Sequence, residues 1–219
     1  MVILVTGGNG DIGSAIVDEY IYQGHKVLSP TSKELDLSSD QSINNFFSKV
    51  TNIDVFVHCA GINNPISFLE LDDHSFDKTF NINTLSSIKI AKFLLPNMIE
   101  NKFGRIVNIS SLWSTLASSQ RTSYSISKAA LDALTRNLAV EFGNCGVLVN
   151  SILPGFVDTK LTRKNLSAKR ISEIIIDTPI QSLVDTIDIA KLTYFLGSIN
   201  NQSITGQSIA IDEGYSIYR

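Results

Sequence analysis

Two side chains in the middle of the sequence have the spacing of a proton-transfer pair. Tyr124 and Lys128 lie four residues apart in a segment, 123–143, whose apolar periodicity is that of a helix, so they share one helix face. A cation at roughly 4 Å, with an effective dielectric constant of about 20, favours the ionised phenol by about three pKa units. That shift would bring a tyrosine towards neutral pH. The same spacing also describes an ordinary exposed pair, so the pair alone does not establish chemistry.

A glycine-rich turn near the amino end has the spacing of a phosphate-binding loop. Gly7, Gly10 and Gly13 follow an apolar run at 2–5 and lead into a helical pattern at 11–24. The first two glycines allow a sharp turn and the close approach of a diphosphate, and the third allows close packing of the helix on the sheet. The free N–H groups at the helix start favour an anion. A glycine-rich turn without a ligand is the alternative for this segment taken alone.

Short apolar runs alternate with longer helical patterns along the chain. We expect strands at 2–5, 26–29, 54–61, 104–111, 146–155 and 207–212. We expect helices at 11–24, 40–50, 75–102, 123–143 and 185–198, with Asp40 as an N-cap and a kink at Pro96. Continuously apolar strands predict a parallel sheet covered on both faces. The expected fold class is α/β, a Rossmann-like doubly wound sheet in three layers. It forms a single domain, 1–219, with a polar, mobile flap at about 156–182.

Composition excludes several classes of function. The 219-residue chain has a formal net charge of −3, which disfavours non-specific nucleic-acid binding. It has no apolar run long enough to span a membrane, and its first residues lack the features of a signal peptide. The three histidines have no metal-ligand spacing, so no metal is expected. Cys59 and Cys145 lie far apart and do not form a disulfide framework, which favours a cytoplasmic location.

These features occur in an order that resembles the short-chain dehydrogenase/reductase family. The glycine turn reads "TGGNGDIG", Asn83 lies in "NIN", Ser111 precedes the tyrosine by thirteen residues, and "YSISK" spans 124–128. The segments "NSILPGFVDT" and "ITGQSIAIDEG" are similar to the family's later strand-turn segments, so the resemblance covers essentially the whole chain. The form indicated is a compact single-domain member with an extended-type glycine motif.

The resemblance implies a reaction and a role for each of these residues. Members transfer a hydride between a nicotinamide cofactor and a carbonyl or secondary alcohol. Tyr124 would be the general acid or base, and Ser111 would bind the substrate oxygen. Lys128 would lower the pKa of the tyrosine and hold the nicotinamide ribose. Asn83 would hold a water that joins Lys128 to solvent.

The resemblance also implies a set of cofactor-binding residues. They are Gly7, Asn9, Gly10, Asp11, Ile12, Gly13, Thr31, Ser32, Lys33, Asp36, Leu37, Ala60, Gly61, Lys128, Pro154, Gly155, Val157 and Thr159. Selectivity for NAD usually needs an acid after the second strand, where this chain has hydroxyls and Lys33. We therefore expect NADP(H) in preference to NAD(H). A solvated loop cation is the alternative for Lys33.

Three residues depart from the family pattern. Asp11 stands where the compact branch has glycine, His58 begins the segment that reads "NNAG" in the family, and Glu213 interrupts the terminal "DGG". We interpret Asp11 as a first-turn helix residue favoured by the helix dipole, and His58 as a structural residue at a strand end. Glu213 concerns a subunit contact more than the chemistry.

The sequence leaves the substrate open. The leading hypothesis is a carbonyl reductase or alcohol dehydrogenase with a small substrate. The alternatives are a 3-oxoacyl-[acyl-carrier-protein] reductase-like enzyme and a non-catalytic dinucleotide-binding sensor. The basic residues of the flap would meet an anionic substrate or form a solvated surface; they are Lys160, Arg163, Lys164, Lys169 and Arg170. Trp113 would line the pocket mouth or pack.

The partners expected for the chain follow from the same reasoning. On family grounds, the helices at 75–102 and 123–143 would form the face of a homodimer or homotetramer. A small-molecule carbonyl or alcohol is the expected substrate partner. No nucleic-acid or membrane partner is expected.

Overall fold

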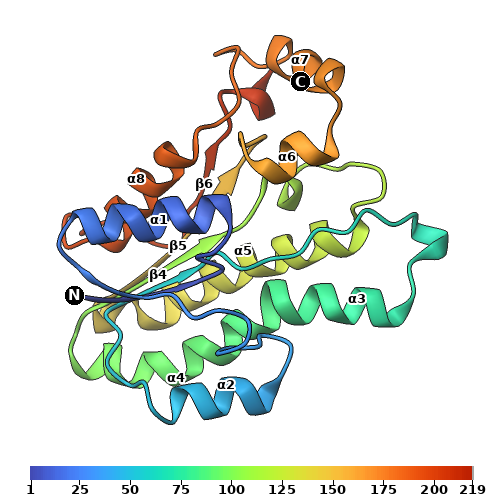
Figure 1. Cartoon of the computed structure of the whole chain (residues 1–219). Coiled ribbons are helices and arrows are strands. Elements are labelled where there is room, and N and C mark those ends of the chain that lie inside the picture. Colours follow the sequence, from blue (N-terminus) through green and yellow to red (C-terminus); the bar gives the residue numbers. More distant parts are fainter. Residues whose placement is uncertain (219) are drawn as a thin grey trace.

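The strands form one parallel sheet in the order β2-β1-β3-β4-β5-β6 (Figure 1). The structure is a computed structural model that describes residues 1–218. The strands are β1 Val2–Thr6, β2 Lys26–Leu28, β3 Val55–His58, β4 Gly104–Ile109, β5 Val147–Pro154 and β6 Ser208–Ile211. The chain runs outward from β1 to β2 and then returns to β3 on the other side of β1. The carboxyl ends of β1 and β3 therefore mark the switch point, where sheets of this kind bind ligands.

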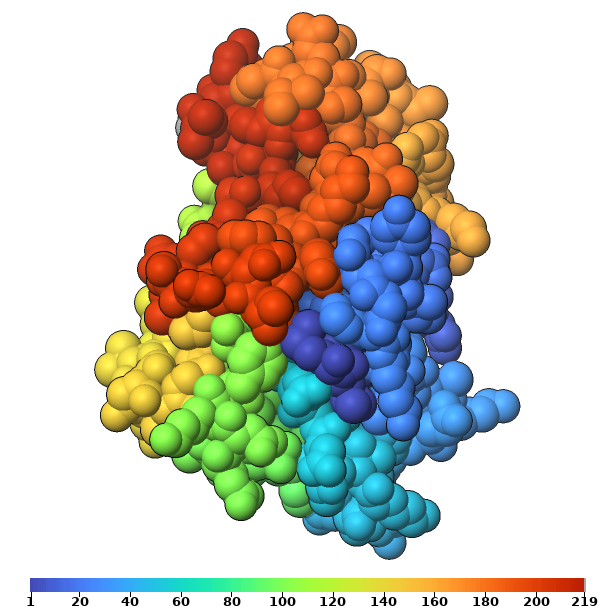
Figure 2. Space-filling model, turned by 90° about the vertical axis from the view of Figure 1, so that its left-hand side faces the viewer, coloured from blue at the N-terminus to red at the C-terminus, as the bar shows by residue number. Residues whose placement is uncertain are grey.

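Helices cover both faces of the sheet, as the apolar strands predict. They are α1 Asp11–Tyr22, α2 Asp40–Phe47, α3 Asp73–Phe80, α4 Ser86–Glu100, α5 Thr122–Phe142, α6 Lys160–Asn165, α7 Ala168–Ile176 and α8 Thr186–Gly197. α1 and α8 lie on one face, and α2, α4 and α5 lie on the other (Figure 1). The blue surface of α1 and the orange-red surface of α8 adjoin on the outside of the molecule (Figure 2). No helix within residues 1–218 is long and apolar enough to cross a membrane.

Each face of the sheet buries its own core. Ile3 and Val5 of β1 pack with Ile16 of α1, while Leu4 between them packs with Ile90 of α4 on the opposite face. This division follows from the alternation of side chains along a strand. All these residues are completely buried, so β1 is apolar from Val2 to Val5 and ends in the buried hydroxyl residue Thr6. The core thereby holds the loops that follow the strands at one common edge.

The expected helix at 75–102 is interrupted at a different place from the one predicted. A π-helical turn, Asn81–Leu85, joins α3 to α4, and Pro96 lies within α4 on its exposed side. α4 continues through Pro96, and the kink or locally irregular turn predicted at this residue stays a prediction. The hydrogen bond that proline cannot donate is lost on the solvent side, where water can replace it. The π turn forms instead because its Thr84 hydroxyl bonds to the carbonyl of Ser127 on α5 at 2.7 Å.

The flap is more regular than its composition indicates. Its polar residues fold into α6 and α7, in each of which a hydroxyl accepts a backbone N–H at the start. Thr159 accepts from Thr162 at 3.1 Å and Ser167 from Arg170 at 3.2 Å. Such caps satisfy amide groups that a short helix leaves free. Ser39, rather than Asp40, caps α2 in the same way. The remaining expected elements are present, with ends shifted by a few residues.

Candidate active site

The carboxyl ends of the central strands open into a cleft of about 810 Å³. Most residues implied by the family resemblance line it: Gly7, Asn9, Gly10, Asp11, Ile12, Gly13, Ser32, Asp36, Leu37, Ala60, Gly61, Ser111, Tyr124, Lys128, Pro154, Gly155, Val157 and Thr159. They come from the loops after β1, β2, β3, β4 and β5 and from α5. Segments far apart in the sequence thus meet at the switch point of the sheet.

Three of the implied residues do not line this cleft. Thr31 donates its backbone N–H and its hydroxyl to the carboxylate of Glu34, at 2.8 and 2.9 Å. Lys33 borders a separate hollow beside α2. Asn83 is completely buried beneath the cleft. Of the residues that motivated the cofactor preference, Thr31 and Lys33 therefore lie outside the cleft wall, whereas Ser32 lines it.

Sequence reasoning missed part of the cleft wall. The cleft is also lined by Pro30, Leu35, Cys59, Ile62, Asn63, Ile82, Ile109, Ser110, Lys160, Leu161 and Lys164. Ile109 ends β4, so a rule that takes every residue at a carboxyl strand end would have found it. Lys160 and Lys164 were predicted only as flap cations that meet an anionic substrate or form a solvated surface, and their place in the cleft wall depends on how the flap folds back. Trp113 is absent from the wall and packs edge-to-face on Phe156, with ring centroids 6.0 Å apart.

The glycine loop has no room for side chains. Gly7 has a φ of 74°, and a Cβ built on it would lie 2.7 Å from Ala60. A Cβ on Gly13 would lie 2.1 Å from the carbonyl oxygen of Gly7. These contacts hold the loop against β3 and bring the first turn of α1 to the cleft. The bare backbone and the free N–H groups of α1 therefore form a cradle that fits a diphosphate.

Lys128 does not approach Tyr124 as closely as the helix spacing suggests. Its Nζ lies 5.8 Å from the centroid of the tyrosine ring and donates a hydrogen bond of 2.7 Å to the carbonyl of Ile109. Burial lowers the pKa of Lys128 to about 8. Burial also raises the pKa of Tyr124, while its hydrogen bond with Ser111 and the charge of Arg121 act to lower it. In this structure the hydrogen bond with Ser111 and the charge of Arg121 therefore favour the ionised phenol.

Asn83 uses its whole side chain to hold the loop after β3. Its Nδ2 donates to the carbonyl of Ile62 and to the hydroxyl of Ser127, both at 3.0 Å. Its Oδ1 accepts the backbone N–H of Ile62 at 2.8 Å. Both amide hydrogens are thus committed to protein partners. The backbone carbonyl of Asn83 lies in the π turn.

His58 reaches that carbonyl from beneath. Its Nε2 lies 3.2 Å from the backbone oxygen of Asn83, and its Nδ1 lies 3.1 Å from the hydroxyl of Thr6. A carbonyl only accepts, so Nε2 carries the proton and Nδ1 accepts from Thr6. Burial lowers the pKa of His58 to about 3. The ring is neutral, completely buried and placed as a structural group at the end of β3.

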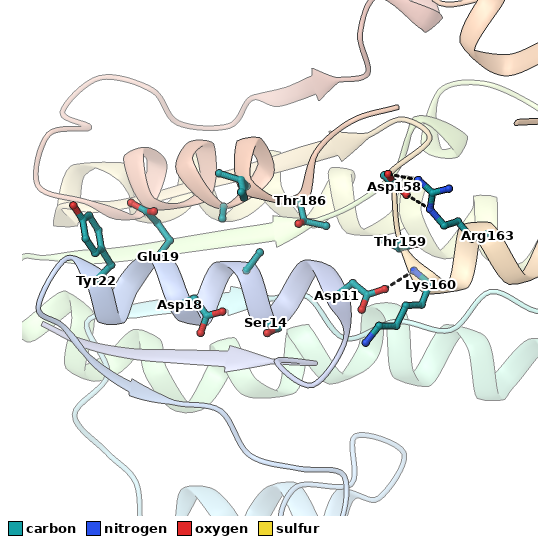
Figure 3. Close-up of a pocket in the computed structure, with 13 residues that line it drawn as sticks. Asp11, Ser14, Asp18, Glu19, Tyr22, Asp158, Thr159, Lys160, Arg163 and Thr186 are labelled. Carbon is teal, nitrogen blue, oxygen red and sulfur yellow. Dashed lines mark hydrogen bonds and ion pairs between the residues drawn. The ribbon is translucent and has the colours of Figure 1, made fainter. Parts of the chain in front are cut away.

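Asp11 is the first residue of α1, and its carboxylate is directed towards the flap. Its Oδ2 accepts the backbone N–H of Lys160 at 2.7 Å (Figure 3). The position at the helix start stabilises the carboxylate through the helix dipole. The side chain therefore makes a long-range contact in addition to the local role predicted for it.

Comparison with known proteins gives consistent relatives over nearly the whole chain. A family model described as Enoyl-(Acyl carrier protein) reductase matches residues 12–216. The 3-oxoacyl-[acyl-carrier-protein] reductase FabG of Rickettsia typhi (strain ATCC VR-144 / Wilmington) is 31% identical over 229 residues, covering 96% of this chain and 95% of the relative. The oxidoreductase UcpA of Escherichia coli (strain K12) is 31% identical over 211 residues, covering 92% of this chain and 80% of the relative.

Solved structures with bound dinucleotides are also similar. A 4-hydroxyisoleucine dehydrogenase complexed with NADH has a TM-score of 0.92 at 29% identity, covering 99% of this chain and 98% of that one. A Tyr-to-Phe variant of ElxO with NADPH bound has a TM-score of 0.89 at 27% identity, with the same coverage. The similar structures therefore include one with each form of the cofactor.

Proposed function

This chain belongs to the short-chain dehydrogenase/reductase family and is an NAD(P)-dependent oxidoreductase, and from that premise we propose its cofactor, its substrate class and its reacting residues. The reaction is hydride transfer between NADP(H) and a small carbonyl compound or secondary alcohol. The observation that carries this proposal is the meeting of Ser111, Tyr124 and Lys128 with the glycine loop in one cleft. The residues that line the cleft all lie between Thr6 and Lys164.

The proposed roles follow from the chemistry of each side chain. Reduction places negative charge on the substrate oxygen, which needs a proton and a hydrogen-bond donor. Tyr124 donates the proton and Ser111 orients the oxygen. Lys128 holds the nicotinamide ribose through its ammonium group, and Asn83, which lies in the π turn, holds the loop after β3 at Ile62. The bound dinucleotide supplies or accepts the hydride.

The cofactor-binding residues fall into three groups in this proposal. The glycine loop and the first turn of α1 hold the diphosphate, through Gly7, Asn9, Gly10, Asp11, Ile12 and Gly13. The residues after β2, with Asp36 and Leu37, meet the adenosine, and Ala60 and Gly61 pack against its ribose. Pro154, Gly155, Val157 and Thr159 border the nicotinamide. Thr31 and Lys33 would contribute only after a movement of their loop, since both lie outside the cleft wall.

The proposed NADP(H) preference depends on the acids near β2. Glu34 is committed to Thr31, and one oxygen of Asp36 accepts both the N–H and the hydroxyl of Ser38, at 2.9 and 2.7 Å. Among the described residues that line the cleft, the acids are Asp11 and Asp36. Glu34 lies outside the cleft wall, and the Asp36 oxygen that Ser38 occupies is not free to accept a ribose hydroxyl, whereas NAD selectivity usually needs an acid that accepts both hydroxyls. The preference therefore rests on a missing acceptor more than on the charge of Lys33.

Calorimetric titration with NADPH and with NADH tests the cofactor. We expect NADPH to bind at least about tenfold more tightly, as one extra charge-assisted hydrogen bond would provide. A carbonyl panel assayed with the preferred cofactor then tests the reaction. Tighter binding of NADH would contradict the NADP(H) assignment, and binding of neither would contradict the assignment of the cleft.

A 3-oxoacyl-[acyl-carrier-protein] reductase-like activity is the second candidate. The observation that favours it is the similarity to FabG over 96% of this chain. Turnover of acetoacetyl thioesters, compared with free carbonyl compounds of the same size, separates the two. A strong preference for the carrier-protein thioester over the coenzyme A thioester would favour this candidate over a small-molecule reductase.

We propose that the chain forms a homodimer or homotetramer through the faces of α4 and α5. Phe93 on α4, with Ile126 and Val140 on α5, are large apolar side chains that remain exposed. The side chain of Val140 is 87% exposed. Burying this group of apolar side chains against a second copy would remove them from water. Light scattering should give at least a dimer at micromolar concentration, and Val140→Asp should lower the mass. Ile21→Asp on α1 is the matched control, and a monomeric wild type would contradict the proposal.

We also propose a cytoplasmic location. Both cysteines, Cys59 and Cys145, are free thiols in the structure, and burial raises the pKa of Cys59 to about 12. A protonated thiol of this kind does not form disulfides readily. These features suit a reducing compartment.

A further inference from the structure

The short helix α6 forms part of the wall of the cofactor cleft. Lys160, Leu161 and Lys164 line the cleft together with the glycine loop. In Figure 3 the side chain of Lys160 extends past Asp11 at the start of α1. The helix therefore borders the section of the cleft that lies over the loop. Its two lysines, Lys160 and Lys164, are therefore placed beside any ligand of the cleft.

The cations of the flap separate into paired and unpaired groups. Arg163 donates two hydrogen bonds of 2.6 Å to Asp158, and Arg170 pairs with Glu173 at 2.9 Å (Figure 3 shows the first pair). Within residues 1–218, Lys160 and Lys164 have no acidic partner. They are also the flap cations that line the cleft. Lys169 also has no acidic partner among the described residues, but it does not line the cleft, so Lys160 and Lys164 are the unpaired flap cations that border the ligand cavity.

The charges around the cleft are arranged along its length. Lys128 lies beside Tyr124, where it bonds to Ile109. Asp36 lies in the loop after β2 and bonds to Ser38. Lys160 and Lys164 line the same cleft as Asp11 and the glycine loop, and the backbone N–H of Lys160 bonds to Asp11. A diphosphate, with two negative charges, is the ligand chemistry that fits a bare glycine loop faced by two ammonium groups.

We propose that Lys160 and Lys164 bind the diphosphate of the dinucleotide from above the glycine loop, and that Asp11 positions them. This inference rests on the dinucleotide site of the proposed function. It assigns α6 as a charged lid of that site. Lys169, which has no acidic partner either, lies outside the cleft and takes no part in the proposed contact.

Asp11 acts through the backbone of the lid. Its Oδ2 accepts the N–H of Lys160 at 2.7 Å, which joins the first residue of α6 to the first residue of α1. A carboxylate beside a diphosphate would repel it, but here the oxygen is occupied by a donor on the lid. The unusual acid in the glycine motif is therefore a positioning residue that couples the lid to the phosphate loop.

The lysines are tested by measuring the affinity of the full-length protein for NADPH and NADH. Lys160→Gln and Lys164→Gln should each raise Kd about 2- to 5-fold, as exposed charge contacts of up to about 1 kcal/mol require, and the double variant about tenfold. The loss should be equal for NADPH and NADH, because both carry the diphosphate. The effect should shrink as salt is raised. Lys169→Gln, an equal change on an exposed flap residue outside the cleft, is the matched control.

Each other outcome overturns the inference. Losses no larger than that of Lys169→Gln would show that the lysines do not bind the cofactor. A loss confined to NADPH would move the contact to the 2′-phosphate. Failure of the wild type to bind either dinucleotide would contradict the proposed function itself, and is thereby distinguished from failure of the lid assignment.

The role of Asp11 is tested by the dissociation rate of NADPH. Asp11→Ala removes the acceptor and should speed dissociation about 3- to 10-fold, as the loss of one hydrogen bond of about 1 kcal/mol allows. Asp11→Asn keeps an oxygen acceptor for the Lys160 N–H and should retain most of the wild-type rate. Equal rates in both variants, or slower dissociation in Asp11→Ala, would show that Asp11 does not hold the lid.

Discussion

Replacing Tyr124 with phenylalanine should lower the turnover of carbonyl substrates by about 10²- to 10⁴-fold, the usual contribution of a positioned general acid. The change removes the hydroxyl and keeps the ring, so the cleft wall and the contact with Lys128 persist. Binding of NADPH should therefore stay within about twofold of the wild type. Steady-state kinetics with the best substrate of the carbonyl panel, and calorimetric titration, measure the two effects.

The matched control for this variant is Tyr22→Phe, which removes a hydroxyl from an exposed side chain on α1. It should leave both turnover and binding unchanged. Retention of turnover in Tyr124→Phe would remove the tyrosine from the reaction. It would also favour the non-catalytic dinucleotide-binding sensor. Loss of NADPH binding would instead assign the hydroxyl a role in holding the cofactor.

Acid should destabilise the wild-type protein through His58. Burial lowers the pKa of this ring to about 3 in the folded chain, against about 6.5 for a free histidine. Between these values the unfolded chain binds more protons than the folded one, so the free energy of unfolding falls as the pH falls from about 6.5 towards 3. The full window corresponds to about 5 kcal/mol, a large part of the stability of an ordinary domain.

Urea unfolding between pH 7.5 and about 4.5 measures this effect. His58→Asn places the family's own residue at this position, with one donor and one acceptor but no titration. We expect its unfolding free energy to change less steeply with pH, by up to about 1.4 kcal/mol per pH unit. His74→Asn, at an exposed position on α3, should follow the wild-type curve. Parallel curves for wild type and His58→Asn would contradict the assignment.

The contact of His58 with the π turn allows stability and turnover to be compared in the same variant. The ring supports the backbone carbonyl of Asn83, and Asn83 holds the loop at Ile62. Both residues lie beneath the cleft rather than in it. A substitution at His58 should therefore change stability more than turnover, in contrast to Tyr124→Phe.

Much of the fold and part of the site were predictable because they depend on local periodicity. The strand, glycine turn and helix at the amino end are consecutive in the chain, and their geometry follows from residue spacing and glycine conformation. Tyr124 and Lys128 share a helix face because a helix repeats every 3.6 residues. The apolar strands required a sheet buried on both faces, which brought the loops to one edge.

The placements that failed or were missed depend on side-chain contacts, one local and the others between distant residues, that residue spacing does not show. Lys33 lies outside the cleft because Glu34 captures Thr31 and shapes their loop. The helix at 75–102 breaks at its π turn, rather than at proline, because Ser127 and His58 take up the backbone and side chains of that turn.

The proton-transfer pair and the flap show the same difference between local structure and long-range placement. Helix spacing placed Lys128 beside Tyr124, but burial and the carbonyl of Ile109 decided where its ammonium group points. Hydroxyl caps determine locally that the flap is helical, whereas the contact of Asp11 with Lys160, 149 residues away, decides where α6 lies. Local spacing sets conformation through short-range sterics and hydrogen bonds. The competition for buried partners is settled only when the whole chain has packed.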